Sequence, residues 1–229
     1  MALYTIADLH LSLGSDKPMD VFPSWKDYVS RIESNWRALV EETDTVVVAG
    51  DISWAMQLPE SEKDFAFLDS LPGKKLLLKG NHDYWWTTRR KMESFFEEKG
   101  FSSLQIIDNN AVVVEGRAVC GTRGWLYNSA SEEDKKIVRR EAGRLTASLD
   151  EAERLGAEPV VFLHYPPVYD GMECREILSI LEQRQIRDCY FGHIHGTQAA
   201  RRAVQGEYHG TRLHLVACDY VNFMPVLVR

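Results

Sequence analysis

Five short apolar runs in this chain each end in polar residues of one chemical kind. The runs are rich in branched and aromatic side chains, as is typical of buried strands. The residues that follow them are, in chain order, Asp8 and His10, then Asp51, then Asn81, His82 and Asp83, then His164, and finally His193 and His195. In open α/β sheets, ligands bind beyond the carboxyl ends of the strands. We therefore expect the five strand ends to converge on one cleft.

The side chains in this set are those that divalent transition metals prefer. Imidazole and carboxylate suit Mn, Fe, Zn, Co or Ni, and the set contains no cysteine, which disfavours a structural zinc site. Alternate residues of a strand face the same side, so the pair Asp8 and His10, and likewise His193 and His195, can chelate one centre or serve two adjacent ones. The set exceeds the about four ligands of one tetrahedral ion. It suits two ions roughly 3.5–4 Å apart that share a carboxylate and a bridging hydroxide.

Three glycines support this interpretation. Gly50, Gly80 and Gly192 each directly precede a candidate ligand. Glycine permits a tight turn and a close approach of the backbone to the neighbouring segment. We expect such approaches beside a compact metal site.

The order of predicted elements indicates a mixed α/β fold with helices over a sheet, and with a two-sheet core. Apolar runs at 3–8, 45–51, 74–81, 159–167 and 188–196 are predicted strands, and 111–121 reads as two strands joined at Glu115-Gly116. The tail, 211–229, alternates like an antiparallel pair. Predicted helices cover 24–42 with Ser24 as N-cap, 62–71, 87–99 closed by Gly100, 131–155 closed by Gly156, and 174–184. No linker or internal repeat divides the chain, so we expect a single domain over 1–229.

Composition narrows the class of partner. The formal net charge of −7 disfavours binding to extended nucleic acid, because an acidic surface repels phosphate backbones. No apolar run approaches the roughly 20 residues needed to cross a bilayer, and the first residues lack the features of a signal peptide. The four cysteines form no CxxC pair and read as buried thiols. These features favour a cytoplasmic protein with no membrane partner; they do not indicate an oligomeric state.

The five blocks together resemble the calcineurin-like metallophosphoesterase superfamily. The matching motifs are Asp-x-His at 8–10, Gly-Asp at 50–51, Gly-Asn-His-Asp at 80–83, the lone His164 in LHYPP, and Gly-His-x-His at 192–195. All five occur in the family's order and span almost the whole chain. Each block alone is weak evidence, whereas five ordered blocks are specific.

The resemblance implies a four-layer αββα sandwich, with two mixed β-sheets flanked by helices, and a dinuclear metal site. It assigns Asp8, His10, Asp51 and His195 to one ion, and Asp51, Asn81, His164 and His193 to the other. In the implied reaction, a metal-bridging hydroxide attacks a phosphate mono- or diester of a small molecule or nucleotide. His82 is expected near the leaving-group oxygen as proton donor or charge stabiliser, with Asp83 orienting its ring.

Other functions on the same scaffold are a phosphoprotein phosphatase, a nuclease, a lipid-precursor pyrophosphatase acting on a UDP-linked lipid, and a non-catalytic binding module. The chain is short for a phosphoprotein phosphatase. The acidic charge weighs against a nuclease, and His82 stands where the lipid-precursor enzymes carry Arg. No candidate ligand is missing, which weighs against a binding module.

Two further residues are candidate substrate contacts. Trp85 follows the 80–83 motif and is expected either to stack on a substrate ring or to pack in the core. Arg123 lies in the glycine-punctuated segment 121–128 and is expected either to pair with a phosphate or to be a surface arginine.

Overall fold

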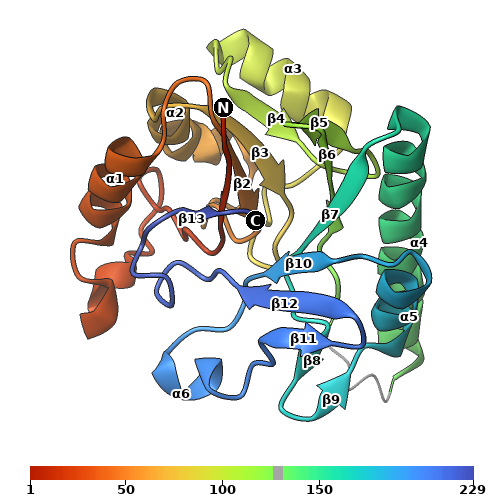
Figure 1. The fold of residues 1–229 in the computed structure, drawn as a ribbon. Coiled ribbons are helices and arrows are strands. Elements are labelled where there is room, and N and C mark those ends of the chain that lie inside the picture. Colours follow the sequence, from red (N-terminus) through yellow and green to blue (C-terminus); the bar gives the residue numbers. More distant parts are fainter. Residues whose placement is uncertain (126–130) are drawn as a thin grey trace.

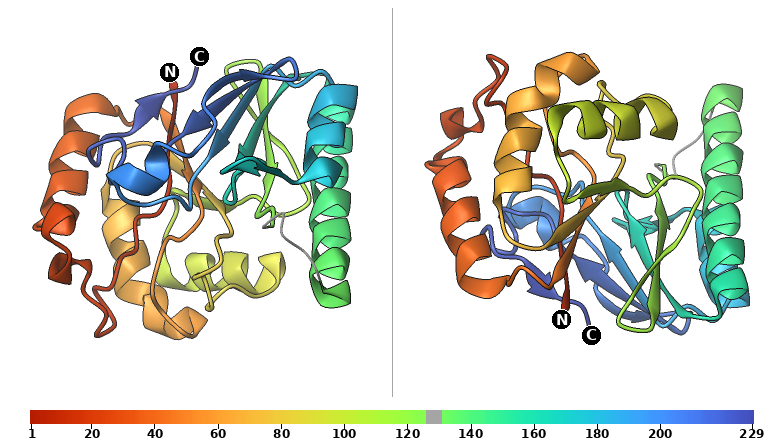
Figure 2. Two further views of the ribbon diagram at one scale, coloured as in Figure 1. Left: turned by 90° about the horizontal axis from the view of Figure 1, so that it is seen from below. Right: turned by 90° about the horizontal axis from the view of Figure 1, so that it is seen from above.

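Two β-sheets pack face to face, and helices cover the outer face of each. The computed structural model describes residues 1–125 and 131–229. Figures 1 and 2 show the resulting order of layers: helices, sheet, sheet, helices. This arrangement confirms the predicted αββα sandwich with two mixed sheets. In the described parts of the chain, no helix is long and apolar enough to cross a membrane.

The first sheet is built from the N-terminal part of the chain and the last strand. Its neighbours run in the order β13 (Val226–Leu227), β1 (Leu3–Ile6), β2 (Thr45–Ala49), β3 (Lys74–Leu78) and β4 (Leu104–Ile106). The strands β1 to β4 are parallel, and β13 pairs antiparallel with β1. The helices over it are α1 (Tyr28–Leu39), α2 (Glu62–Ser70) and α3 (Arg89–Lys99).

The second sheet is built from the C-terminal half of the chain. Its order is β11 (Gly206–Tyr208), β12 (Thr211–Leu215), β10 (Asp188–Phe191), β7 (Glu158–Leu163), β6 (Arg117–Thr122) and β5 (Val112–Val114). The four central strands are parallel, and the two edge strands are antiparallel. The helices α4 (Glu132–Leu155) and α5 (Arg175–Gln183) cover its outer face.

Short elements complete the chain. They are three 3-10 turns (Met19–Val21, Pro23–Trp25 and Leu58–Ser61), the hairpin β8 (Val168–Tyr169) and β9 (Met172–Glu173), and α6 (Thr197–Ala200).

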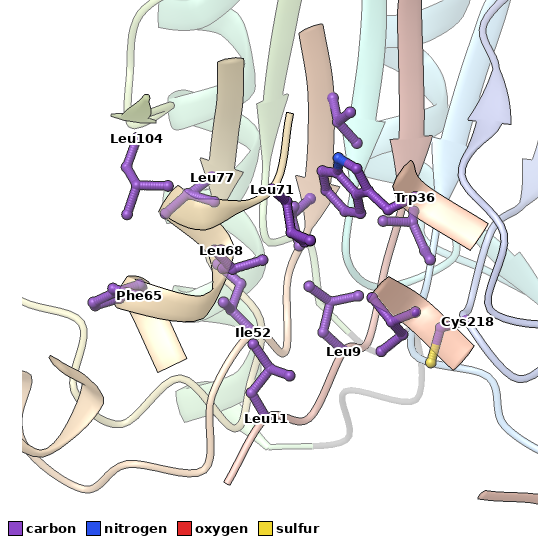
Figure 3. Close-up of a cluster of buried hydrophobic side chains, with 14 of the residues drawn as sticks. Leu9, Leu11, Trp36, Ile52, Phe65, Leu68, Leu71, Leu77, Leu104 and Cys218 are labelled. Atoms are coloured by element: carbon purple, nitrogen blue, oxygen red, sulfur yellow. The ribbon is translucent and has the colours of Figure 1, made fainter. Parts of the chain in front are cut away.

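Successive residues of the central strands point to opposite faces of their sheet. Because both sets of side chains are apolar, each sheet is buried on both faces. In β2, Val46 and Val48 face the helices, whereas Val47 and Ala49 face the other sheet. The apolar layer under α1 to α3 is drawn in Figure 3, where Trp36 lies among aliphatic side chains. Its indole nitrogen donates a hydrogen bond to the Pro72 carbonyl at 3.0 Å, which satisfies the one polar group of this buried ring.

Two sequence predictions are wrong. The helix predicted over 24–42 begins only at Tyr28, because Asp27 adopts a left-handed backbone (φ 54°) that a right-handed helix cannot pass through. The Ser24 cap is therefore absent, and the 3-10 turn Pro23–Trp25 occupies the first part of the predicted helix. The helix also ends earlier, at Leu39, where Val40 is extended.

The tail is not a hairpin. Its two strands lie in different sheets: β12 runs parallel to β10, and β13 runs antiparallel to β1. The segment between them crosses from one sheet to the other, and Val216 bonds to both. Its amide donates to the Phe191 carbonyl at 2.8 Å, and its carbonyl accepts from the Ala7 amide at 2.9 Å.

The four cysteines provide a test of this packing. All are free and buried, and burial raises the pKa of Cys120 to about 12 and that of Cys174 to about 11. Because the thiolate is the reactive form, native protein should react with a thiol-specific disulfide reagent far more slowly than protein unfolded in guanidinium, which should titrate four thiols. Rapid reaction of any thiol in the native state would contradict the burial.

Candidate metal centre

The predicted ligands come together where the carboxyl ends of both sheets meet. Asp8 follows β1, Asp51 follows β2 and Asn81 follows β3 in the first sheet, while the second sheet supplies its histidines after β7 and β10. Backbone bonds join these ends: the Asp8 amide donates to Gly50 at 2.9 Å, and the Gly192 amide donates to the His164 carbonyl at 3.1 Å. Five segments far apart in sequence therefore form one rim.

The first group of ligand atoms consists of Asp8, His10 and His195, which could together hold one metal ion. The Nε2 atoms of His10 and His195 lie 3.2 Å apart, and His195 Nε2 lies 3.3 Å from Asp8 Oδ1. These three atoms converge on one point from two sheets.

The second group consists of Asp51, His164 and His193, which could hold another ion. His164 Nε2 lies 3.4 Å from Asp51 Oδ2 and 2.7 Å from the amide oxygen of Asn81. Asn81 therefore belongs to this group by position.

Asp51 lies between the two groups. Its Oδ1 accepts a hydrogen bond from the His82 amide at 2.8 Å. Its Oδ2 faces both groups, at 3.4 Å from His164 Nε2 and 3.8 Å from His10 Nε2. This oxygen is in the position that a shared ligand would need.

The site contains buried negative charges that bound cations would neutralise. The carboxylates of Asp8 and Asp51 are 0% and 1% exposed, and buried charges require partners. Among the described residues, their ion pairs are with histidines alone. Burial would raise the pKa of Asp8, but His195 and His164 outweigh it and hold that pKa below its ordinary value. The site thus collects negative charge without a lysine or arginine to neutralise it.

The four histidines of the two groups differ in the direction of their pKa shifts. Burial lowers the pKa of His10 and of His193 to about 4, so both rings are neutral and have a free lone pair at neutral pH. Burial would also lower the pKa of His164 and His195, but the neighbouring Asp side chains raise them to about 9 and about 10. Neutral imidazoles and carboxylates are ligands for Mn, Fe, Zn, Ni or Co, so the donor set fits divalent ions of this kind.

The backbone of the ligand segments is held in sparsely populated conformations. Asp8, His10, Asp51 and His193 all have φ between 46° and 70°. Such left-handed residues cost of order 1–3 kcal/mol each and persist only where the surroundings impose them. Here they turn the chain sharply at the strand ends and aim the side chains into the cleft.

Close approach of neighbouring segments explains all three predicted glycines, since at Gly50 a Cβ would lie 2.6 Å from His164 Nδ1. A Cβ at Gly80 would lie 2.1 Å from the amide nitrogen and from Oδ1 of Asp51, and one at Gly192 would lie 2.4 Å from Asp8 Oδ2. None of these positions leaves room for a side chain.

The role predicted for Asp83 is wrong. Its carboxylate does not contact the His82 ring; it accepts hydrogen bonds at 2.7–3.2 Å from the amides of Asp51, Ile52, Ser53 and Gly80 and from the Trp85 indole. Burial raises the pKa of Asp83 to about 6, with the Asp51 charge adding to the effect. The side chain therefore fixes the two loops that carry Asp51 and Asn81.

His82 is half-buried and lies beside the first group, with its ring centroid 5.7 Å from that of His10. Its Nδ1 is buried without a hydrogen-bond partner among the described residues. Burial lowers the pKa of His82, with Asp51 acting in the opposite direction. An Nδ1 without an acceptor favours the neutral ring with its proton on Nε2, which is the nitrogen left for a bound molecule.

The two candidate substrate contacts point elsewhere. Trp85 is 2% exposed and packs edge-on against Phe65 in the helix-side core, so its ring has no free face.

The Arg123 side chain is mostly buried, pairs with Glu141 of α4 at 3.5 Å and lies over the Trp125 ring. Its carbonyl accepts from the amides of His164 and Tyr165, which places its backbone next to the site. Positions 126–128 of the predicted loop lie outside the described residues.

Two residues near the site were missed from the sequence. The Asp219 carboxylate lies 3.0 Å from His195 Nδ1 and also accepts the Gly196 amide at 2.8 Å. This contact leaves His195 Nε2 free to face Asp8. Asp219 follows the apolar run of β12, so it carried the same strand-end signal as the other blocks. Trp54, which packs against His10 and His82, gave no such signal.

Comparisons with known proteins agree with this geometry. The family model for calcineurin-like phosphoesterase matches residues 1–197. A protein of unknown function from Aquifex aeolicus is 14% identical, with a TM-score of 0.54, over 99% of this chain and 95% of that one. The phosphopantetheinyl hydrolase from Mycobacterium tuberculosis is also 14% identical over the same shares, with a TM-score of 0.55. At this identity both establish similarity of fold alone. Curated proteins gave no match.

We predict that Asp219→Asn weakens metal binding about 10–100-fold, because a carboxylate behind a ligating imidazole fixes its orientation and raises its basicity. Competition with a chromogenic chelator measures the affinity. Asp188→Asn is the matched control: Asp188 holds His214 at 2.8 Å in the same way, but at the opposite end of β10. Equal affinities for Asp219→Asn and wild type would contradict the assignment.

We also predict that Gly80→Ala destabilises the fold by about 1–3 kcal/mol, the usual cost of forcing atoms into a packed site, and reduces metal content. Gly143→Ala, in the middle of α4 with no atom within 4 Å of its Cβ, should instead stabilise by up to about 1 kcal/mol. Denaturant unfolding of both variants measures the contrast. A free energy of unfolding for Gly80→Ala equal to that of the wild type would show that the loops can move apart freely.

Proposed function

Because this chain belongs to the calcineurin-like phosphoesterase family, we propose that it hydrolyses phosphate esters at a pair of divalent metal ions in this cleft. The observation that carries the proposal is the convergence of two ligand groups on either side of Asp51 Oδ2. Seven side chains from five separate segments are drawn to one point, four of them by left-handed backbone. A packed core requires no such convergence.

We assign the ligands as two overlapping sets. Asp8, His10, Asp51 and His195 would hold one ion, and Asp51, Asn81, His164 and His193 the other. When bound, the two ions would neutralise the charge of the phosphoryl oxygens and lower the pKa of a coordinated water. Manganese, iron, zinc, nickel and cobalt all suit this donor set.

The remaining roles belong to the protein side chains. Hydrolysis adds a water oxygen to phosphorus and breaks the P–O bond to the alcohol, whose oxygen gains negative charge and then a proton. His82 offers its Nε2–H beside the first ligand group, where it would stabilise that developing charge by a hydrogen bond. Asp83 and Asp219 hold the ligand loops and the His195 ring in place.

The substrate class that we propose is a small-molecule or nucleotide phosphate ester. The net charge of −7 opposes binding to a long polyanion. The similarity of fold to a phosphopantetheinyl hydrolase makes phosphopantetheine esters a reasonable part of any screen. A panel of mono- and diesters, tested with each of the five metals, measures both the preferred ester and the preferred ion.

The decisive pair of variants is Asp51→Asn and His82→Ala. Asp51→Asn should abolish metal binding and hydrolysis together, because both ligand groups lose their shared oxygen. His82→Ala should retain about two ions per chain, yet hydrolyse an alkyl ester about 10²–10⁴-fold more slowly, the usual scale for a residue that assists a leaving group.

An aryl ester with a good leaving group serves as the internal control for His82→Ala, since it needs little assistance and should lose much less. Metal analysis by mass spectrometry and steady-state rates give the comparison. A wild-type chain that binds no metal and hydrolyses no ester would refute the proposed function. Unchanged alkyl ester hydrolysis in His82→Ala would refute the role of His82 alone.

A further inference from the structure

Trp54 packs against two functional imidazoles at once. Its ring stacks on His10 with centroids 4.9 Å apart and planes 22° apart, and it meets His82 at 4.5 Å and 50°. The two imidazole centroids are themselves 5.7 Å apart. The three rings therefore form a compact triangle in which a predicted metal ligand and the predicted leaving-group residue share one aromatic neighbour.

The Trp54 backbone is fixed to the segment that carries His10. The Trp54 amide donates to the Leu11 carbonyl at 2.8 Å, and the Leu11 amide donates to Ile52 at 2.9 Å. The preceding residue, Ser53, donates its amide to Asp83 and its hydroxyl to Asp64. The Trp54 backbone is thus fixed by the same loop network that positions Asp51, whereas its buried indole nitrogen has no hydrogen-bond partner among the described residues, so the ring is held by packing.

The His82 ring has no such polar anchor. None of the described residues hydrogen-bonds either of its ring nitrogens, and Asp83 is occupied by backbone amides. Tyr84 touches the ring only edge-on, at 6.1 Å, and is itself mostly exposed. Packing against Trp54 is therefore the main contact that can set the ring orientation.

We propose that Trp54 is the positioning residue for His82: its indole holds the imidazole so that Nε2 faces the leaving-group oxygen of the phosphate ester. The inference rests on the proposed phosphoesterase function and deepens it. A ring that could rotate freely would move Nε2 out of hydrogen-bond reach, and a misplacement of about 1 Å can cost as much as 10²-fold in rate.

A positioning role predicts an effect that depends on the leaving group. Trp54→Leu should lower kcat for an alkyl phosphate ester about 10- to 100-fold, with KM nearly unchanged, while an aryl ester with a good leaving group loses little. Trp54→Phe, which keeps an aromatic face, should recover most of the alkyl rate. Trp86→Phe is the matched control, because Trp86 packs beside Trp85 on the helix-side core. Metal content and thermal stability of each variant are measured alongside.

A second readout needs no activity. In the metal-free protein, the His82 Cε1 proton signal, assigned by its loss in His82→Ala, should shift in Trp54→Leu, because the ring current of the indole is removed, and stay in place in Trp86→Phe. An unmoved signal would overturn the proposal.

The kinetic outcomes separate the two hypotheses. An alkyl-to-aryl rate ratio in Trp54→Leu equal to that of wild type would overturn the positioning role while leaving the phosphoesterase function intact. When that unchanged ratio results from equal losses for both esters, or when metal is lost, the pattern marks damage to the metal centre and the positioning role is likewise overturned. Absence of metal-dependent hydrolysis in wild type would instead refute the proposed function.

Discussion

The Asp83 carboxylate is the interaction on which the rest of the site depends. It is buried, and it gathers amides from the turn after β2 and from the turn after β3, together with the Trp85 indole. Hydrogen bonds to a charged acceptor are about twice as strong as neutral ones. This one side chain, together with the bond from the His82 amide to Asp51, therefore fixes the spacing between Asp51 and Asn81, which follow neighbouring strands.

The second constraint is electrostatic. Two buried carboxylates, Asp8 and Asp51, pair within the described part of the chain with imidazoles and with no lysine or arginine. The cost of burying such charge is several kcal/mol per group unless it is compensated. The protein compensates in part by raising the pKa of His164 and His195, so that these rings take up protons. A site that draws protons in this way is equally disposed to draw metal cations, which connects the electrostatics of the fold to the proposed chemistry.

The sequence was sufficient to predict helices over a two-sheet core and to predict which polar side chains meet at one rim, because strand ends can be recognised locally; the four-layer order came from the family resemblance. Continuous apolar runs such as 45–49 indicate strands that are buried on both faces, and polar residues directly after them indicate one edge of the sheet. The sequence was not sufficient where long-range contacts determine a helix end, a strand pairing or the role of a side chain. Asp27 stops α1 through a left-handed turn that helical periodicity does not reveal, and β12 and β13 separate into two sheets although their alternation suits a hairpin. Asp83 bonds to distant amides, and no spacing rule distinguishes that role from orienting its neighbour His82. Trp85 could equally line a cleft or fill a core until the position of Phe65 is known.

The division of the candidate ligands between the two sheets has a consequence for how the proposed centre is assembled. By residue 81 a chain emerging from the ribosome carries four of the seven candidate ligands, but His164, His193 and His195 belong to the second sheet, and His10 meets His195 across 185 residues of sequence. Each half alone would expose an incomplete, loosely held set of donors. Any cation bound by the finished protein would therefore link the first and last parts of the chain. The affinity for that cation would depend on the docking of one sheet on the other. Metal release would therefore be an early sign that the two halves have separated.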